Sequence, residues 1–204
     1  MARPAEFDRT EVLDKAMEVF WRTGFTATSV ADLVTATSLK PGSLYSAFDS
    51  KRGLFVEVID TYAARRIDSA QKVLENTETP LTAIHEFFNN LRLDACNDEI
   101  GRGCLMVNTM LELATEDADL RERITGYLDQ IEGFLCTALT RAKELGQLES
   151  HANPATLATF LMSNVWGLRV MSSSRPDHAR YQQVIDHVLA SLPVTMTASV
   201  KIAS

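Results

Sequence analysis

Residues 28–48 constrain the fold of this chain more than any other stretch, because they divide into two short amphipathic segments around a tight turn. Ser29 and Asp32 fit the S-x-x-D pattern that caps the start of a helix. Pro41, whose fixed φ suits a first helical position, opens the second segment. The pattern predicts two short helices joined by a turn, the helix-turn-helix arrangement.

The rest of the chain also predicts helices. There is no sustained alternation of apolar and polar residues, and no Asn-Gly or Asp-Gly dipeptide marks a hairpin. Apolar residues recur at helical spacing, which predicts an all-α protein. The helices expected outside residues 28–48 are 9–23, 51–75, 81–96, 104–114, 115–146, 154–171 and 177–192.

Composition excludes several classes of protein. The 204 residues contain no apolar run long enough for a transmembrane span, and the first ten residues lack the apolar region of a secretory signal. Three cysteines, with no CxxC pair, predict neither a disulfide framework nor a metal site. We therefore expect a cytoplasmic protein with no cofactor, no metal and no membrane partner.

The helix-turn-helix makes DNA binding the leading functional interpretation, since one helix of the motif braces the DNA backbone while the next enters the major groove. The net charge of −7 does not contradict this, because residues 1–52 carry seven basic and seven acidic side chains and the deficit lies in 53–204. Phosphate binding depends on locally placed Lys, Arg and N–H groups. We expect modest, strongly salt-dependent non-specific affinity.

An ordered set of residues near the N-terminus resembles the DNA-binding domain of TetR-family transcriptional repressors. The set is Ala16, Phe20, Gly24-Phe25-Thr26, Thr28-Ser29-Val30, Leu33, Lys40-Pro41-Gly42-Ser43-Leu44-Tyr45, Phe48 and Lys51. The resemblance implies a three-helix helix-turn-helix domain over 1–52, joined to a larger helical ligand-binding and dimerisation domain. We expect 53–75 to be a linking helix and 76–204 to be that second domain, with the polar break at 76–80 as the boundary.

The start of the second short helix carries most of the predicted DNA contacts. Gly42 lets the backbone approach a phosphate, and the hydroxyls that follow can bind phosphate or base edges. By the resemblance, Tyr45 and Lys51 contact the DNA backbone; whether Lys40 reads a guanine or contacts a phosphate is left open. The predicted DNA-binding residues are Thr28, Ser29, Lys40, Pro41, Gly42, Ser43, Tyr45, Ser46 and Lys51.

The resemblance also implies a homodimer on a near-palindromic operator and a small-molecule effector. The interface is expected on 154–172 and 177–192, where Phe160, Leu161, Val165, Trp166, Leu168, Val184, Val188 and Leu189 face either the partner or their own core. The candidate effector-binding residues are Phe88, Leu91, Cys104, Met106, Met110, Trp166 and Arg169. Arg169 is expected to pair with an acidic ligand group or with a helix carboxylate.

Cys104 has a second interpretation, because it lies at the expected start of a helix beside Arg102. Both features favour a reactive thiolate, which makes the residue a candidate redox or electrophile sensor; the alternative is a small buried side chain. A thiol-dependent helical enzyme would need a histidine to activate this thiol, and none of the four histidines lies in a recognisable catalytic motif. We therefore expect no enzyme but a ligand-responsive regulator, a repressor by resemblance, and rank a protein-binding helical adaptor below it.

Overall fold

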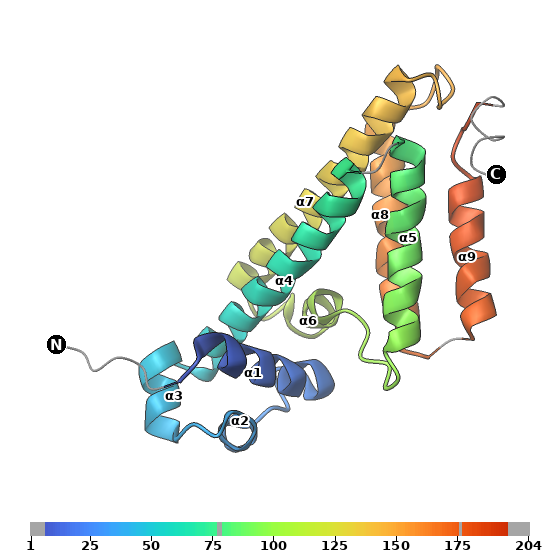
Figure 1. Cartoon of the computed structure of the whole chain (residues 1–204). Helices are drawn as coiled ribbons and strands as arrows, with labels where there is room; N and C mark the ends of the chain where they lie inside the picture. Colours follow the sequence, from blue (N-terminus) through green and yellow to red (C-terminus); the bar gives the residue numbers. More distant parts are fainter. Residues whose placement is uncertain (1–6, 77–78, 176, 196–204) are drawn as a thin grey trace. The chain divides into compact units, whose positions relative to one another are not determined.

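The computed structural model describes residues 7–76, 79–175 and 177–195, and within these ranges it is all-α (Figure 1). An isolated antiparallel bridge joins Leu148 to Val194. This confirms the predicted fold class. The helices are α1 (Arg9–Thr23), α2 (Val30–Thr37), α3 (Pro41–Phe48), α4 (Lys51–Asn76), α5 (Pro80–Asn97), α6 (Leu105–Leu113), α7 (Ala118–Glu144), α8 (Pro154–Ser172) and α9 (His178–Ala190).

The chain divides into two compact units. The first comprises Met1–Arg65 and Leu105–Ile124, and the second comprises Arg66–Cys104 and Thr125–Ser204. This division follows contacts within the fold, so the functional boundaries expected at residues 52 and 75 stay a prediction. Residues 1–6 of the predicted first domain, 77–78 of the predicted break and 196–204 of the tail lie outside the described residues.

The first unit has an aromatic core. The rings of Phe20 and Phe55 meet edge to face with centroids 4.7 Å apart, and the Phe25 ring lies 4.9 Å from that of Phe55. Leu33 of α2 and Leu44 of α3 are fully buried. Burying such side chains is worth roughly 1.5–3 kcal/mol each, so the apolar faces of the two short helices fix them to this core.

Local sequence sets the limits of the first three helices. α1 ends at Gly24, whose φ of 78° is accessible to glycine without steric cost. α2 ends at Ser38 with φ 59°, and α3 ends at Asp49 with φ 60°. Ser38 is in the left-handed αL conformation, and Asp49 combines its positive φ with a ψ of −40°; a Cβ atom disfavours both.

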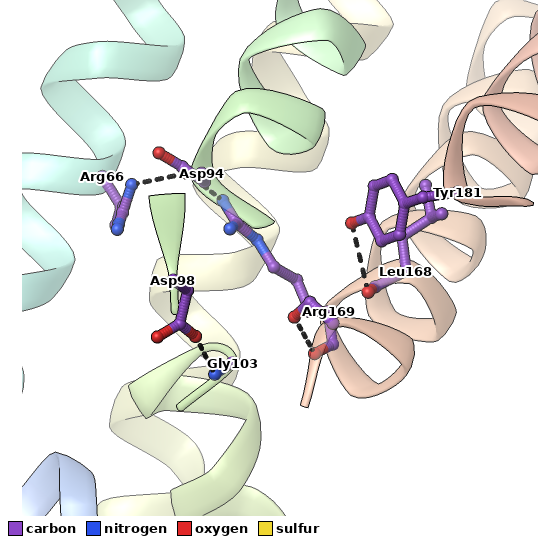
Figure 2. Close-up of polar contacts among 8 residues, drawn as sticks. Arg66, Asp94, Asp98, Gly103, Leu168, Arg169 and Tyr181 are labelled. Carbon is purple, nitrogen blue, oxygen red and sulfur yellow. Dashed lines mark hydrogen bonds and ion pairs between the residues drawn. The ribbon is translucent and has the colours of Figure 1, made fainter. Parts of the chain in front are cut away.

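The second unit contains α5, α8 and α9, which contact one another, together with parts of α4 and α7. The hydroxyl of buried Tyr181 on α9 donates to the Leu168 carbonyl of α8 at 3.2 Å (Figure 2). Burial raises the pKa of Tyr181 to about 12, so this donor keeps its proton. Among the described residues, no helix has the length and apolar character that crossing a membrane requires.

Candidate nucleic-acid interface and effector region

The side chain of Thr28 stabilises the turn between α1 and α2 by hydrogen bonds within the protein. Thr28 is buried, its hydroxyl donates to the Gly24 carbonyl, and it shares a 2.6 Å hydrogen bond with the hydroxyl of Thr23. These bonds turn the side chain toward the protein. Its predicted phosphate contact is untested.

Ser29 starts α2 through a complete capping box. The Asp32 backbone N–H donates to the Ser29 hydroxyl at 3.1 Å, and the Ser29 N–H donates to the Asp32 carboxylate at 2.8 Å. The Ser29 hydroxyl also donates to that carboxylate at 2.7 Å. Hydrogen bonds from the Ser29 side chain and backbone lower the pKa of Asp32, which keeps the cap ionised. The box satisfies the helix start with groups of α2 itself.

The start of α3 is different, because its first helical residue is Pro41 and its N-cap residue Lys40 makes no side-chain cap within the described chain. One face of α3 packs inward through Leu44 and Phe48. The other side is exposed, and a Cβ added at Gly42 would meet no atom within 4 Å. The exposed residues at this helix start are Lys40, Pro41, Gly42, Ser43, Tyr45 and Ser46, and with the exposed Ser29 before α2 they make seven of the nine predicted DNA contacts.

Lys51, at the first position of α4, is half-buried and holds the turn that precedes α2. Its ammonium donates to the Phe25 and Thr28 carbonyls, both at 2.8 Å, and lies 4.3 Å from the centre of the Phe25 ring. The structure therefore gives Lys51 a positioning role that the sequence did not predict. Whether it also contacts the DNA backbone stays a prediction.

The neighbouring residue, Arg52, joins the start of α4 to the start of α7. Its guanidinium donates to both carboxylate oxygens of Asp117, at 2.7 and 2.8 Å. Asp117 also accepts from the Leu120 N–H at 3.0 Å and so caps α7. The hydrogen bond from Arg52 lowers the pKa of Asp117 to about 2. This pair fixes the first turn of α4, from which Lys51 projects.

The candidate effector residues differ in exposure. Phe88, Leu91, Cys104 and Met106 are buried, whereas Met110, Trp166 and Arg169 are half-buried. Arg169 donates to an Asp94 carboxylate oxygen at 3.0 Å, and Arg66 donates to the same oxygen at 2.7 Å (Figure 2). Of the two partners expected for Arg169, the helix carboxylate is therefore present.

Cys104 is buried immediately before α6. Its neighbour Arg102 donates to Asp98 at 3.1 Å, and the Gly103 N–H donates to the same carboxylate at 2.8 Å. Asp98 thus organises the loop that precedes the thiol. Within the described residues, no group of three His, Cys, Asp or Glu side chains is placed to hold a metal ion.

A groove of about 610 Å³ lies in the second unit along α5 and α9, and the sequence did not predict it. Its lining combines apolar residues such as Ile185 and Leu189 with polar ones such as Gln182 and Asp186, and includes none of the seven candidate effector residues. His85 also lines it; burial lowers the pKa of this imidazole, and the charge of Asp186 partly opposes that shift. At neutral pH the groove therefore contains an uncharged imidazole.

Two family models match the chain in sequence. The model for bacterial regulatory proteins of the tetR family matches residues 12–58, which contain α2 and α3. The model for a tetracyclin repressor-like C-terminal domain matches residues 80–188, more than half of the chain. The chain belongs to the TetR family of bacterial transcriptional regulators. This confirms the resemblance carried by the N-terminal residues and makes the chain a DNA-binding regulator.

Similar proteins agree with this placement in the TetR family. The HTH-type transcriptional repressor ComR of Escherichia coli (strain K12) is 30% identical over 192 residues, which cover 94% of this chain and 91% of ComR. The TetR-family regulator CifR, solved as a cysteine variant with 26-base-pair double-stranded operator DNA, superposes with a TM-score of 0.80 at 28% identity, covering 94% of this chain and all of CifR. The reduced form of NemR from E. coli has a TM-score of 0.83 at 18% identity over 92% of this chain and 98% of NemR, and shows the shared fold alone.

Proposed function

We propose that the exposed side of α3 binds operator DNA and that the chain is a repressor which a small molecule or an electrophile releases from that DNA. One observation carries the proposal. α3 buries Leu44 and Phe48 and exposes residues 40–43, Tyr45 and Ser46 at an N-terminus without a side-chain cap. Backbone N–H groups at such a terminus attract phosphate oxygens.

The roles within this surface follow from side-chain chemistry. Gly42 admits a phosphate close to the backbone, and Ser43, Tyr45 and Ser46 supply hydroxyls for phosphate or base edges. Lys40 adds a mobile cation that contacts either a phosphate or a guanine. Ser29 and Lys51 act mainly by holding α2 and the preceding turn, which brings α3 into position.

Dimerisation is part of the proposal, since residues 1–52 carry no net charge and a single copy binds phosphate weakly. Phe160 and Val170 on α8 and Val184 on α9 are the exposed large apolar residues of these helices, whereas Leu161 and Val188 are buried in the chain's own core. Exposed large apolar residues on these two helices fit an interface between copies. Two reading helices then lie one DNA turn apart on a near-palindromic operator.

The effector is proposed to act through the second unit, among its buried and half-buried candidates Phe88, Leu91, Trp166 and Arg169, or at Cys104. Ligand and DNA favour different dimer states, so each weakens binding of the other by the same factor. We further infer that the chain works in the cytoplasm and acts by binding rather than catalysis, as expected for a DNA-binding regulator.

Fluorescence anisotropy on duplexes tiled across the DNA upstream of the chain's own gene tests DNA binding. The expected result is specific binding that Tyr45→Ala and Lys40→Ala both weaken, with Lys40→Ala lowering the salt slope by about 1. Lys72→Ala is the matched control, because the Lys72 side chain is 69% exposed and lies in the second unit. If Lys72→Ala lost as much DNA affinity as Lys40→Ala, the assignment of α3 as the DNA-binding helix would be overturned.

The proposed release by an electrophile is tested with N-ethylmaleimide on the preformed protein–DNA complex. Release from DNA is expected for the parent and for Cys136→Ser, and is expected to fail for Cys104→Ser. Normal release of Cys104→Ser would reject the sensor role and leave a non-covalent effector.

A further inference from the structure

Glu112 makes contacts that its own helix does not explain. It lies in the last turn of α6, where a negative side chain opposes the negative end of the helix dipole. Its carboxylate accepts the backbone N–H of Thr26 at 2.7 Å and that of Phe25 at 3.0 Å. These partners belong to the turn between α1 and α2, 86 and 87 residues away in sequence and in the same compact unit.

The turn is shaped to receive this carboxylate. Gly24 has a φ of 78°, and a Cβ placed on it would lie 2.9 Å from one Glu112 oxygen. Burial alone would raise the pKa of Glu112, but the hydrogen bonds from Thr26 and Phe25 and the charge of Lys51 outweigh it and lower the pKa. The carboxylate therefore stays ionised at neutral pH.

Lys51 donates to backbone carbonyls of the same turn, while Glu112 accepts from backbone N–H groups of that turn. The Lys51 ammonium of α4 thus binds backbone carbonyls, and the Glu112 carboxylate of α6 binds backbone N–H groups, of the segment that leads into Ser29 and the capping box of α2. We call the Glu112 carboxylate and the Lys51 ammonium around residues 24–28 the turn clasp.

We propose that Glu112 is a positioning residue for DNA binding: through the turn clasp it fixes the orientation of α2 and, with it, the exposed side of α3. The proposal rests on the proposed function, in which α3 contacts the operator. Because α2 and α3 contact each other, a turn that is free to rotate would spread the DNA-contacting residues over several orientations. Binding would then select one of them at a cost in affinity.

Glu112→Gln tests this proposal, because the amide keeps the size of the side chain and presents one oxygen where the carboxylate presents two. Glu116→Gln is the matched control, since Glu116 is an exposed carboxylate of the same unit and its loss changes the net charge equally. Removing a negative charge alone strengthens attraction to DNA. The turn clasp predicts the opposite sign for Glu112→Gln.

The expected result is operator binding at least about tenfold weaker for Glu112→Gln, the worth of one charge-assisted hydrogen bond, with parent-like or tighter binding for Glu116→Gln. Glu112→Asp, which keeps the charge, should recover part of the loss. In the free protein, amide hydrogen exchange at Phe25 and Thr26 should speed up in Glu112→Gln while exchange at the other amides of the unit stays near that of the parent. A merely structural role would instead speed exchange throughout the unit.

The outcomes separate this proposal from the proposed function. If the parent and Glu116→Gln bind operator DNA and Glu112→Gln binds equally well, the positioning role is overturned and DNA binding by α3 stands. Unchanged exchange at Phe25 and Thr26 overturns it as well. If none of the three binds any upstream duplex, the proposed function fails and the role of Glu112 in DNA binding fails with it.

Discussion

α2 and α3 are helices of equal length on one core, and the hydrogen-bonding groups at their N-termini are treated in opposite ways. Both have eight residues and bury two side chains, Leu33 and Thr37 in α2 and Leu44 and Phe48 in α3. α2 satisfies its start with Ser29 and Asp32, whereas α3 starts at Pro41 without a side-chain cap in the described chain. The comparison teaches that the helix which supports DNA binding caps its own start with side chains, while the helix proposed to contact DNA starts without a side-chain cap.

The largest effect is expected from removing the buried leucine that each of the two helices contributes to the core. Leu33→Ala and Leu44→Ala each delete a fully buried side chain and should lower the free energy of unfolding by about 2–5 kcal/mol. Urea denaturation followed by circular dichroism measures both. Equal losses would show that the core supports the helices alike; a loss below about 1 kcal/mol at either site would contradict its burial in a tight core.

The next effect separates the two helix starts. Ser29→Ala removes the capping box of α2 and should lower the free energy of unfolding by about 1 kcal/mol. Lys40→Ala, at the equivalent position of α3, should leave stability unchanged because no cap is lost. The same denaturation experiment compares them, and equal destabilisation by both variants would remove the distinction between the helix starts.

Gly42→Ala sharpens the comparison from the side of α3. The added methyl meets no atom within 4 Å, and alanine favours a helix over glycine, so stability should stay equal or rise by up to about 1 kcal/mol. DNA affinity should nevertheless fall, because the methyl occupies the space proposed for a phosphate. Anisotropy and thermal melting on one preparation test both signs; unchanged affinity would mean that no phosphate approaches Gly42.

The smallest effect is a pH dependence confined to the capped helix. The pKa of Asp32 is lowered in the folded protein, so the cap contributes fully above the unfolded value near 3.8 and loses its contribution as the pH falls through the lower folded value. Asp32→Asn should remove this part of the acid destabilisation. Unfolding measured in steps through that acid range, for parent and variant, tests it; parallel curves would show that the carboxylate does not stabilise the cap.

Local signals in the sequence predicted much of the fold. Ser29, Asp32, Gly24 and Pro41 act on neighbours within four residues, so their patterns can be read without the tertiary structure. The same holds for the exposed side of α3, because the spacing of Leu44 and Phe48 fixes which side is buried.

Contacts between distant parts of the chain could not be predicted in this way. Glu112 with Phe25, Arg52 with Asp117 and Arg169 with Asp94 join residues 87, 65 and 75 positions apart. In the sequence, each of these charged residues resembles any solvated helix side chain. Only the packing of their helices brings the pairs together, which is also why the groove along α5 and α9 went unpredicted.

Ser38, the residue that ends α2, has a consequence for engineering. Its φ of 59° holds a side-chain-bearing residue in a conformation that disfavours a Cβ atom by about 1–2 kcal/mol. The backbone of the linker between α2 and α3 is therefore strained at Ser38, and a glycine at this position would relieve the strain. Because Ser38 lies outside the set of residues proposed to contact DNA, Ser38→Gly is expected to relieve this strain without removing a proposed DNA contact.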